Sequence, residues 1–113
     1  MNFKPELIDL ILSGRKTQTR RPVSDNPRSP WYREKCGLQV GRDYAICPGR
    51  AKPASGRVLI EATRLERLGD ISSADAVAEG FRDRNEFEIY LWNLYGEFDP
   101  EQLVWVVQFR RGG

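Results

Sequence analysis

The sequence contains no histidine, and this absence removes several kinds of chemistry. Ser-His-Asp and Cys-His catalysis both need an imidazole, so neither is available. Acid–base work must therefore fall to lysine, carboxylate, tyrosine or cysteine side chains. A zinc site is not expected either, because the two cysteines, Cys36 and Cys47, form no C-x-x-C pair. We expect no metal and no cofactor, and we interpret both cysteines as packing residues.

Long hydrophobic runs are also missing from the sequence. No apolar stretch approaches the ~20 residues that span a bilayer, so no association with a membrane is predicted. The first residues are not typical of a signal peptide, because Glu6 and Asp9 interrupt their apolar run. These features predict a cytoplasmic protein. The length of 113 residues fits one domain over residues 1–113, and the sequence predicts no particular oligomeric state.

Charge is present but unevenly distributed. Residues 1–59 hold 12 Lys/Arg and 5 Asp/Glu, whereas residues 60–109 hold 4 Lys/Arg and 11 Asp/Glu. The first part therefore has a net charge of +7 and the second a net charge of −7, and Arg110 and Arg111 supply the final +2. A basic half of this kind suits a partner that carries phosphate.

The order of predicted elements indicates the fold class. Hydrophobic spacing and cap residues predict three helices, at residues 5–13, 73–79 and 84–95. Alternating patterns predict strands at residues 16–21, 44–47, 56–68 and 103–111, and residues 22–38 are expected to form a long loop. This order is not a βαβ repeat. It predicts an α+β fold, a mixed or antiparallel sheet curled into a small β-barrel with about three flanking helices.

Aromatic residues divide into two groups by their surroundings. Trp92 and Trp105 lie in periodic helix and strand patterns, so both are expected in the core. Trp31 and Tyr44 lie in or near the long loop, where they either pack the loop down or stack on a base. The continuous apolar run of the last strand predicts a central place in the sheet.

The stretch GRKTQTRR, residues 14–21, places threonine hydroxyls among always-charged bases. As a strand it would direct Thr17, Thr19 and Arg21 to one face and Gln18 and Arg20 to the other. Such a stretch suits a solvated surface, a phosphate site, or a nucleophile beside a base. The residues alone leave these three interpretations open.

Gly14-x-Lys16-x-x-Thr19-x-Arg21 resembles the signature of the ASCH domain family, which belongs to the PUA-like superfamily of small β-barrels. The segments ILSGRKTQTRRPV, LERLGDISSADAVAEGF, LWNLYG and VWVVQFRR are similar to successive segments of its phage-associated branch. The resemblance covers nearly the whole chain. The chain departs from the branch in a brief middle segment and in Gly41-Arg42-Asp43, where the family has a Gly-Asp turn.

The resemblance implies two kinds of function. Many ASCH domains are thought to bind RNA beside the motif, and a ribonuclease role has also been proposed in the family. Some compact bacterial members are amidohydrolases that remove the acyl group from N4-acylcytidine with a Lys, a Thr and a Glu. The first two match Lys16 and Thr19, and alignment on A-x-x-E places the third at Glu79. The expected partner is thus a modified cytidine nucleoside or an RNA.

An amidohydrolase would use these residues in defined roles. Thr19 would be the nucleophile, and Lys16 its base, with a pKa lowered by partial burial and by neighbouring arginines. Glu79 would hold Lys16 or pass a proton to the leaving amine, in a charged or protonated form that the sequence leaves open. We expect substrate contacts from seven residues: Gly14, Arg15, Thr17, Arg20, Arg21, Trp31 and Tyr44. In the binding alternative, Lys16 and Arg21 instead clamp a backbone phosphate.

Overall fold

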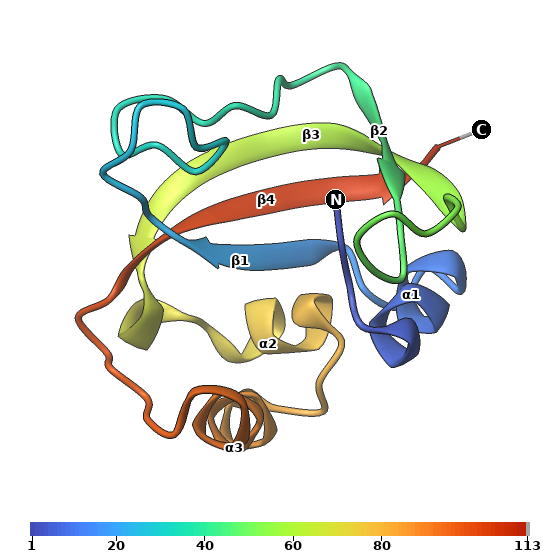
Figure 1. Ribbon diagram of the computed structural model, residues 1–113. Helices are drawn as coiled ribbons and strands as arrows, with labels where there is room; N and C mark the ends of the chain where they lie inside the picture. The colour runs from blue at the N-terminus through green and yellow to red at the C-terminus, as the bar shows by residue number, and fades with distance from the viewer. Residues whose placement is uncertain (113) are drawn as a thin grey trace.

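The computed structural model describes residues 1–112 and contains helices and strands in the predicted order (Figure 1). The elements along the chain are α1 (Pro5–Leu12), β1 (Gln18–Pro22), β2 (Asp43–Ile46), β3 (Gly56–Arg67), the short 3-10 helix η1 (Leu68–Asp70), α2 (Ser73–Glu79), α3 (Arg84–Tyr95) and β4 (Leu103–Arg111). The expected long loop between β1 and β2 contains no helix or strand. β1 differs from the prediction by starting at Gln18 and including Pro22, which an edge strand tolerates.

The four strands form one antiparallel sheet in the order β1-β4-β3-β2. β4 is central, as its apolar sequence predicted. The α+β class and the three flanking helices are confirmed, but the sheet is curved and does not close into a barrel. Within residues 1–112 the free edge of β1 meets α2 instead of β2, since the Thr17 N–H donates to the Ala78 carbonyl at 2.7 Å. Thr17 directly precedes β1, so α2 covers the beginning of the edge that a barrel would pair with a strand.

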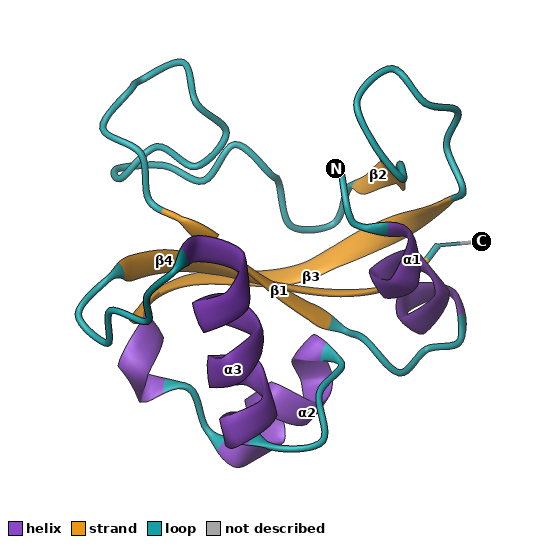
Figure 2. Cartoon of the chain, turned by 60° about the horizontal axis from the view of Figure 1, so that its bottom comes forward, coloured by secondary structure: helices purple, strands orange, loops and turns teal. Residues whose placement is uncertain are grey.

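The sheet has a hydrophobic core on each face, because successive side chains of β4 point to opposite faces. Trp105, Val107 and Phe109 pack with α1, Phe3 and residues of β2 and β3. Val104 and Val106 pack on the opposite side with α2 and α3 (Figure 2). Register pairs Thr19 with Val107 and Arg20 with Val106, which confirms that neighbouring residues of β1 point to opposite faces.

Trp105 is buried as predicted, whereas Trp92 is not. Trp92 is 57% exposed, because α3 directs Phe87 and Leu91 toward the sheet and Trp92 follows Leu91 by only one residue. One residue turns a helix by about 100°, which is enough to move a side chain off the buried stripe. The expectation that Trp92 belongs to the core was therefore wrong.

The ends of α2 are fixed by the residues that the sequence indicated. The Ser72 hydroxyl accepts a hydrogen bond from the Asp75 N–H at 3.0 Å, and Gly80 ends the helix in the left-handed conformation with φ of 110°. A Cβ at Gly80 would lie 2.9 Å from Leu10 Cδ1 and 3.6 Å from Lys16 Cβ. Glycine thus lets the end of α2 approach the residues just before β1.

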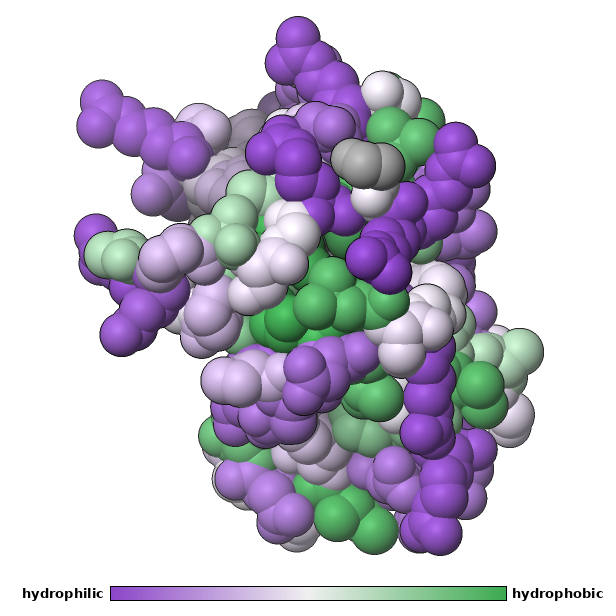
Figure 3. Space-filling model, turned by 90° about the vertical axis from the view of Figure 1, so that its right-hand side faces the viewer, coloured by the Kyte–Doolittle hydropathy of each residue, from purple (hydrophilic) through white to green (hydrophobic). Residues whose placement is uncertain are grey.

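In the face that Figure 3 shows, hydrophilic side chains surround an area of apolar surface. In the described part of the chain, no helix combines the length and apolar character that a bilayer crossing needs. Across residues 1–112 there is also no group of three or more His, Cys, Asp or Glu side chains that could hold a metal ion.

Candidate active site

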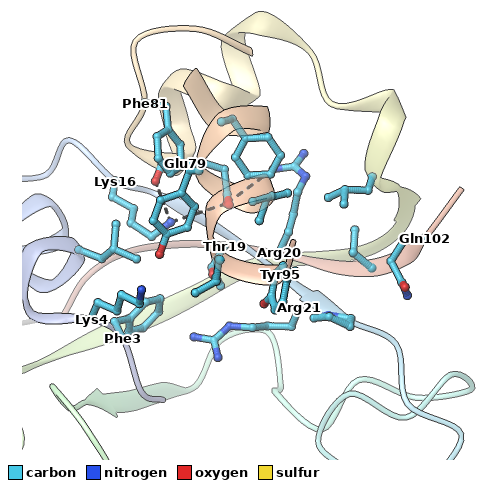
Figure 4. Close-up of a pocket in the computed structure, with 18 of the residues that line it drawn as sticks. Phe3, Lys4, Lys16, Thr19, Arg20, Arg21, Glu79, Phe81, Tyr95 and Gln102 are labelled. Carbon is cyan, nitrogen blue, oxygen red and sulfur yellow. Dashed lines mark hydrogen bonds and ion pairs between the residues drawn. The ribbon is translucent and has the colours of Figure 1, made fainter. Parts of the chain in front are cut away.

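A pocket of about 450 Å³ lies along the free edge of β1 (Figure 4). Three consecutive residues of the strand, Thr19, Arg20 and Arg21, line it. Alternating side chains can share one pocket here because β1 is an edge strand with β4 on one side only. The other walls come from the N-terminal segment, the end of α2 and the buried side of α3.

Lys16 is held inside the protein by the turn that follows α1. Gly14 adopts φ of 82°, and the Lys16 N–H then donates to the Leu10 carbonyl at 3.0 Å. The residue is only 3% exposed. Its Nζ donates to the carbonyl oxygens of Gln18 at 2.7 Å and Glu79 at 2.8 Å. Two backbone acceptors thus fix the amine at the pocket wall.

Glu79 is the last residue of α2 and is 4% exposed. Its Oε2 atom lies 3.8 Å from Lys16 Nζ and 3.6 Å from Arg20 Nη1. Oε2 is buried and has no hydrogen-bond partner within residues 1–112. A buried carboxylate oxygen that faces two cations without a hydrogen bond is costly for folding alone, and such atoms often mark a functional site.

Burial moves the pKa values of this pair toward the neutral forms. Burial lowers the pKa of Lys16, the Glu79 charge opposes that change, and the charges of Arg21 and Arg20 add to it. Burial also raises the pKa of Glu79, while the charges of Lys16, Arg20 and Arg21 oppose the rise. Each group therefore gives up its charge more readily than it would in water.

Thr19 shares the pocket with this pair and is 5% exposed. Its hydroxyl forms no hydrogen bond with Lys16 or Glu79 in the part of the chain that the structure describes. The structure thus brings Lys16 and Glu79 into contact and places Thr19 in the same pocket. Catalytic hydrogen bonds of this kind are often long in unliganded proteins and tighten when substrate binds.

Arg20 belongs to a buried charge network on the α2 side of the sheet. Its guanidinium donates to Glu66 at 2.9 Å, to Asp75 at 3.1 Å and to Gln18 Oε1 at 3.0 Å. Arg64 donates to the same Asp75 carboxylate at 2.8 Å. The sequence motif gave no sign of these carboxylate partners, which come from β3 and α2.

The other predicted contact residues divide into one that lines the pocket and five that do not. Arg21 lines the pocket. Gly14 and Arg15 are exposed, and Thr17 is tied to Ala78 and Phe109 through its backbone.

Trp31 and Tyr44 are also absent from the pocket walls. Both pack against the core on the α1 side of the sheet. The Tyr44 hydroxyl accepts a hydrogen bond from the Gln39 N–H at 2.8 Å. The structure therefore places these two aromatic rings as packing residues, the other option that the sequence left open.

The aromatic walls of the pocket escaped the sequence analysis. Phe3, Phe81, Phe87, Tyr90 and Tyr95 line it, and the Phe81 ring lies 5.5 Å from Phe87 and 5.1 Å from Tyr90. The sequence pattern did predict the helix at residues 84–95 that carries Phe87, Tyr90 and Tyr95. It could not indicate that an open pocket lies between them and β1.

Comparisons with known proteins give the fold a name. No protein-family model matches the chain, and no curated protein matches it. Among solved structures, the chain is similar to an ASCH domain from Lactobacillus crispatus, with a TM-score of 0.71 and 21% identity over 94% of this chain and 70% of that one. The chain has the fold of an ASCH domain. A second similar structure is a DUF984 protein from Enterococcus faecalis, with a TM-score of 0.66 and 20% identity over 94% of this chain and 69% of that one.

The fold confirms the predicted resemblance to ASCH domains for the architecture of the chain. The motif residues from Gly14 to Arg21 form the turn after α1 and the edge strand β1. At these identities the comparison speaks for the fold alone, so placement in the phage-associated branch stays a prediction. The roles of Lys16, Thr19 and Glu79 also stay predictions and are argued below from the geometry.

Proposed function

We propose that the protein is an amidohydrolase that removes the acyl group from N4-acylated cytosine compounds. One observation carries the proposal: a buried Lys16–Glu79 pair lines the same pocket as the Thr19 hydroxyl. A pocket of about 450 Å³ with aromatic walls suits a nucleoside-sized ligand. The motif resemblance supplies the substrate class, and the pocket supplies the three side chains that the chemistry needs.

Lys16 is suited to act as the general base. Its Nζ makes two hydrogen bonds to backbone carbonyls. A neutral amine has two N–H donors and one lone pair, so both bonds persist when the lysine loses its proton. The lone pair is then available to the pocket, and burial makes this form easier to reach because it lowers the pKa of Lys16.

Thr19 is suited to act as the nucleophile. Its oxygen attacks the acyl carbon while its proton passes to Lys16 Nζ, and a tetrahedral oxyanion forms among the positive charges that line the pocket. The bond from the acyl carbon to N4 then breaks, and N4 takes up a proton to leave as an amine. Water hydrolyses the threonine ester, which releases a carboxylic acid and restores the hydroxyl.

Glu79 keeps Lys16 in position and carries protons. Its backbone carbonyl holds the amine at 2.8 Å, and its carboxylate lies 3.8 Å from the same nitrogen. Burial raises the pKa of this carboxyl, which makes it a better proton donor to the leaving N4 than an exposed glutamate. These properties support a proton carrier between the lysine and the leaving group.

The RNA-binding alternative receives less support from the geometry. A phosphate-binding stripe needs accessible cations, but Lys16 and Arg20 are buried. Arg33, which lies in the basic first part of the chain, donates to Asp25 at 2.9 Å. Fewer free cations remain along this surface than the sequence suggested. No observation in the structure favours a ribonuclease.

The direct test is hydrolysis of N4-acetylcytidine, followed as release of cytidine. We expect turnover by the natural sequence and loss of most of the rate in Thr19→Ala. Lys16→Arg should lose about 10²–10⁴-fold, because a guanidinium keeps the charge but cannot act as a base.

Lys52→Arg is the matched control, since the same substitution at an exposed lysine should leave the rate unchanged. Absence of turnover with any N4-acylated cytosine, or full activity in Lys16→Arg, would overturn the proposal.

A further inference from the structure

Four cationic side chains line the pocket, and two of them have no acidic partner. Lys16 and Arg20 are paired with carboxylates, as described above. Lys4 and Arg21 form no ion pair within residues 1–112. An unpaired cation that lines a pocket is a natural site for an anionic group of the ligand.

Arg21 is fixed in place before any ligand arrives. Its Nη2 donates to the Asn2 carbonyl at 2.7 Å, and the centre of its guanidinium lies 4.9 Å from the Phe3 ring and 5.6 Å from the Trp31 ring. Burial lowers the pKa of this arginine, so its charge has lost part of its hydration. A rigid, partly dehydrated guanidinium loses little freedom when it binds an anion.

Lys4 supplies a second positive charge at the mouth of the pocket. It is exposed, and its Nζ lies 5.7 Å from the centre of the Tyr90 ring of α3, which also lines the pocket. Figure 4 shows Lys4 and Arg21 on the same side of the pocket as Phe3. The uncompensated positive charge therefore gathers at one end of the pocket.

The Phe3 ring lies near both the proposed base, Lys16, and the unpaired Arg21. Lys16 Nζ lies 6.0 Å from the ring centre, and the Arg21 guanidinium lies 4.9 Å from it. The proposed base and the unpaired arginine therefore lie near the same aromatic ring. In cytosine, the carbon that bears N4 and the nitrogen that bears ribose lie on opposite sides of a six-membered ring. A cytosine whose N4 faces Lys16 has its ribose-bearing nitrogen on the far side of the base, and in the binding mode considered that side faces Arg21.

Acidic residues close to the pocket argue against a long polyanion. Glu97 and Asp99 line the pocket and form no ion pair within residues 1–112. These carboxylates repel a chain of phosphates that continues past the pocket. Two free cations at one end and carboxylates elsewhere suit a ligand with a single phosphate group.

We infer that the substrate carries a 5′-phosphate, so that the protein acts on an N4-acylated cytidine 5′-monophosphate in preference to the free nucleoside or to a base inside an RNA strand. Arg21 and Lys4 bind the phosphate, and Lys16, Thr19 and Glu79 face the acylated N4. The phosphate site follows from the unpaired cations, whereas the identity of the base rests on the function proposed above.

Calorimetric binding of two products tests the phosphate site without any turnover. We expect cytidine 5′-monophosphate to bind at least about tenfold more tightly than cytidine at low salt, since one charge-assisted hydrogen bond is worth such a factor. Arg21→Gln and Lys4→Gln should each reduce this ratio, and Lys52→Gln should retain it. Equal affinities for the two compounds, or a ratio that survives in both pocket variants, would overturn the inference.

Turnover separates this inference from the proposed function. Rates are compared for N4-acetylcytidine, its 5′-monophosphate and a short RNA with one internal N4-acetylcytidine. Faster hydrolysis of the monophosphate supports the inference. Equal rates for nucleoside and monophosphate, or the fastest rate on the RNA, overturn it while the amidohydrolase proposal stands. Tight binding of cytidine 5′-monophosphate without hydrolysis of any compound leaves the phosphate site in place and removes the proposed reaction.

Discussion

Arg20 and Arg21 are neighbours in the sequence, but they lie on opposite faces of β1 in very different surroundings. Arg20 is buried and contacts the carboxylates of Glu66, Asp75 and Glu79. Arg21 contacts a backbone carbonyl and two aromatic rings, and it forms no ion pair within the described residues. The two arginines therefore serve different purposes, the first in holding the fold together and the second in facing the ligand.

The same division applies along the whole basic motif. A run of bases in a sequence suggests one continuous phosphate-binding surface. Strand geometry instead sends alternate residues to opposite faces, and the carboxylates of neighbouring elements neutralise those on one face. What counts for ligand binding is the charge that remains after this pairing. In this pocket it remains on Arg21 and Lys4.

The largest expected effect comes from removing the internal arginine. Arg20→Met should lower the free energy of unfolding by about 3–5 kcal/mol, because it leaves buried or half-buried carboxylates without their partner. The value should fall toward the lower end, since Arg64 also contacts two of these carboxylates. Urea unfolding measures the change.

Arg21→Met is the matched control for this prediction, because it makes the same substitution one residue further on. It leaves no carboxylate unpaired, so it should cost clearly less stability than Arg20→Met. Equal losses in the two variants would remove the distinction between the two faces of β1. Weaker binding of cytidine 5′-monophosphate, with unchanged binding of cytidine, in Arg21→Met but not in Arg20→Met would support the distinction.

An intermediate effect is expected on the pH dependence of hydrolysis. Lys16 must be neutral to act as a base, so the rate should rise with pH as it loses its proton. The midpoint should lie below the ordinary range of lysine, because burial lowers the pKa of Lys16. The negative charge of Glu79 raises this pKa, so Glu79→Gln should move the midpoint to still lower pH.

Profiles of kcat/KM against pH for N4-acetylcytidine check this shift. Glu88→Gln is the control, because its carboxylate pairs with Arg84 at 3.0 Å on the exposed side of α3. It should leave the midpoint unchanged. A midpoint that moves upward in Glu79→Gln would contradict the assignment of Lys16 as the titrating base.

Local signals in the sequence predicted most of the fold. The helix ends at Ser72, Gly80, Asp83 and Gly96 depend on capping chemistry within a few residues, so the sequence alone indicated them. The central position of β4 followed from its apolar composition. The sequence did not predict that the sheet stays open. The sheet is open because α2 docks at its edge, and no local sequence pattern specifies where a helix will dock.

The candidate site divides in the same way. Lys16, Thr19 and Glu79 were found through the motif, and the structure brings them to one pocket. Two carboxylate partners of Arg20, Glu66 and Asp75, lie more than 40 positions away in the sequence, which a motif cannot contain. The prediction that Trp92 is buried was wrong for a more local reason, since a shift of one residue on a helix changes which side chain is buried.

The smallest predicted effect concerns how closely α2 approaches the edge of β1. Gly80 and Gly14 both adopt left-handed conformations, so replacing either with alanine should cost about 1–2 kcal/mol of unfolding free energy. Gly80→Ala should cost more than Gly14→Ala, because its new Cβ would lie 2.9 Å from Leu10 Cδ1, whereas a Cβ at Gly14 meets no atom within 4 Å. The contact also pushes the end of α2 away from Lys16, so Gly80→Ala should lose hydrolysis that Gly14→Ala keeps. Urea unfolding and N4-acetylcytidine turnover of both variants measure the two effects. Equal stability and equal activity in the two variants would show that the site does not depend on this close approach.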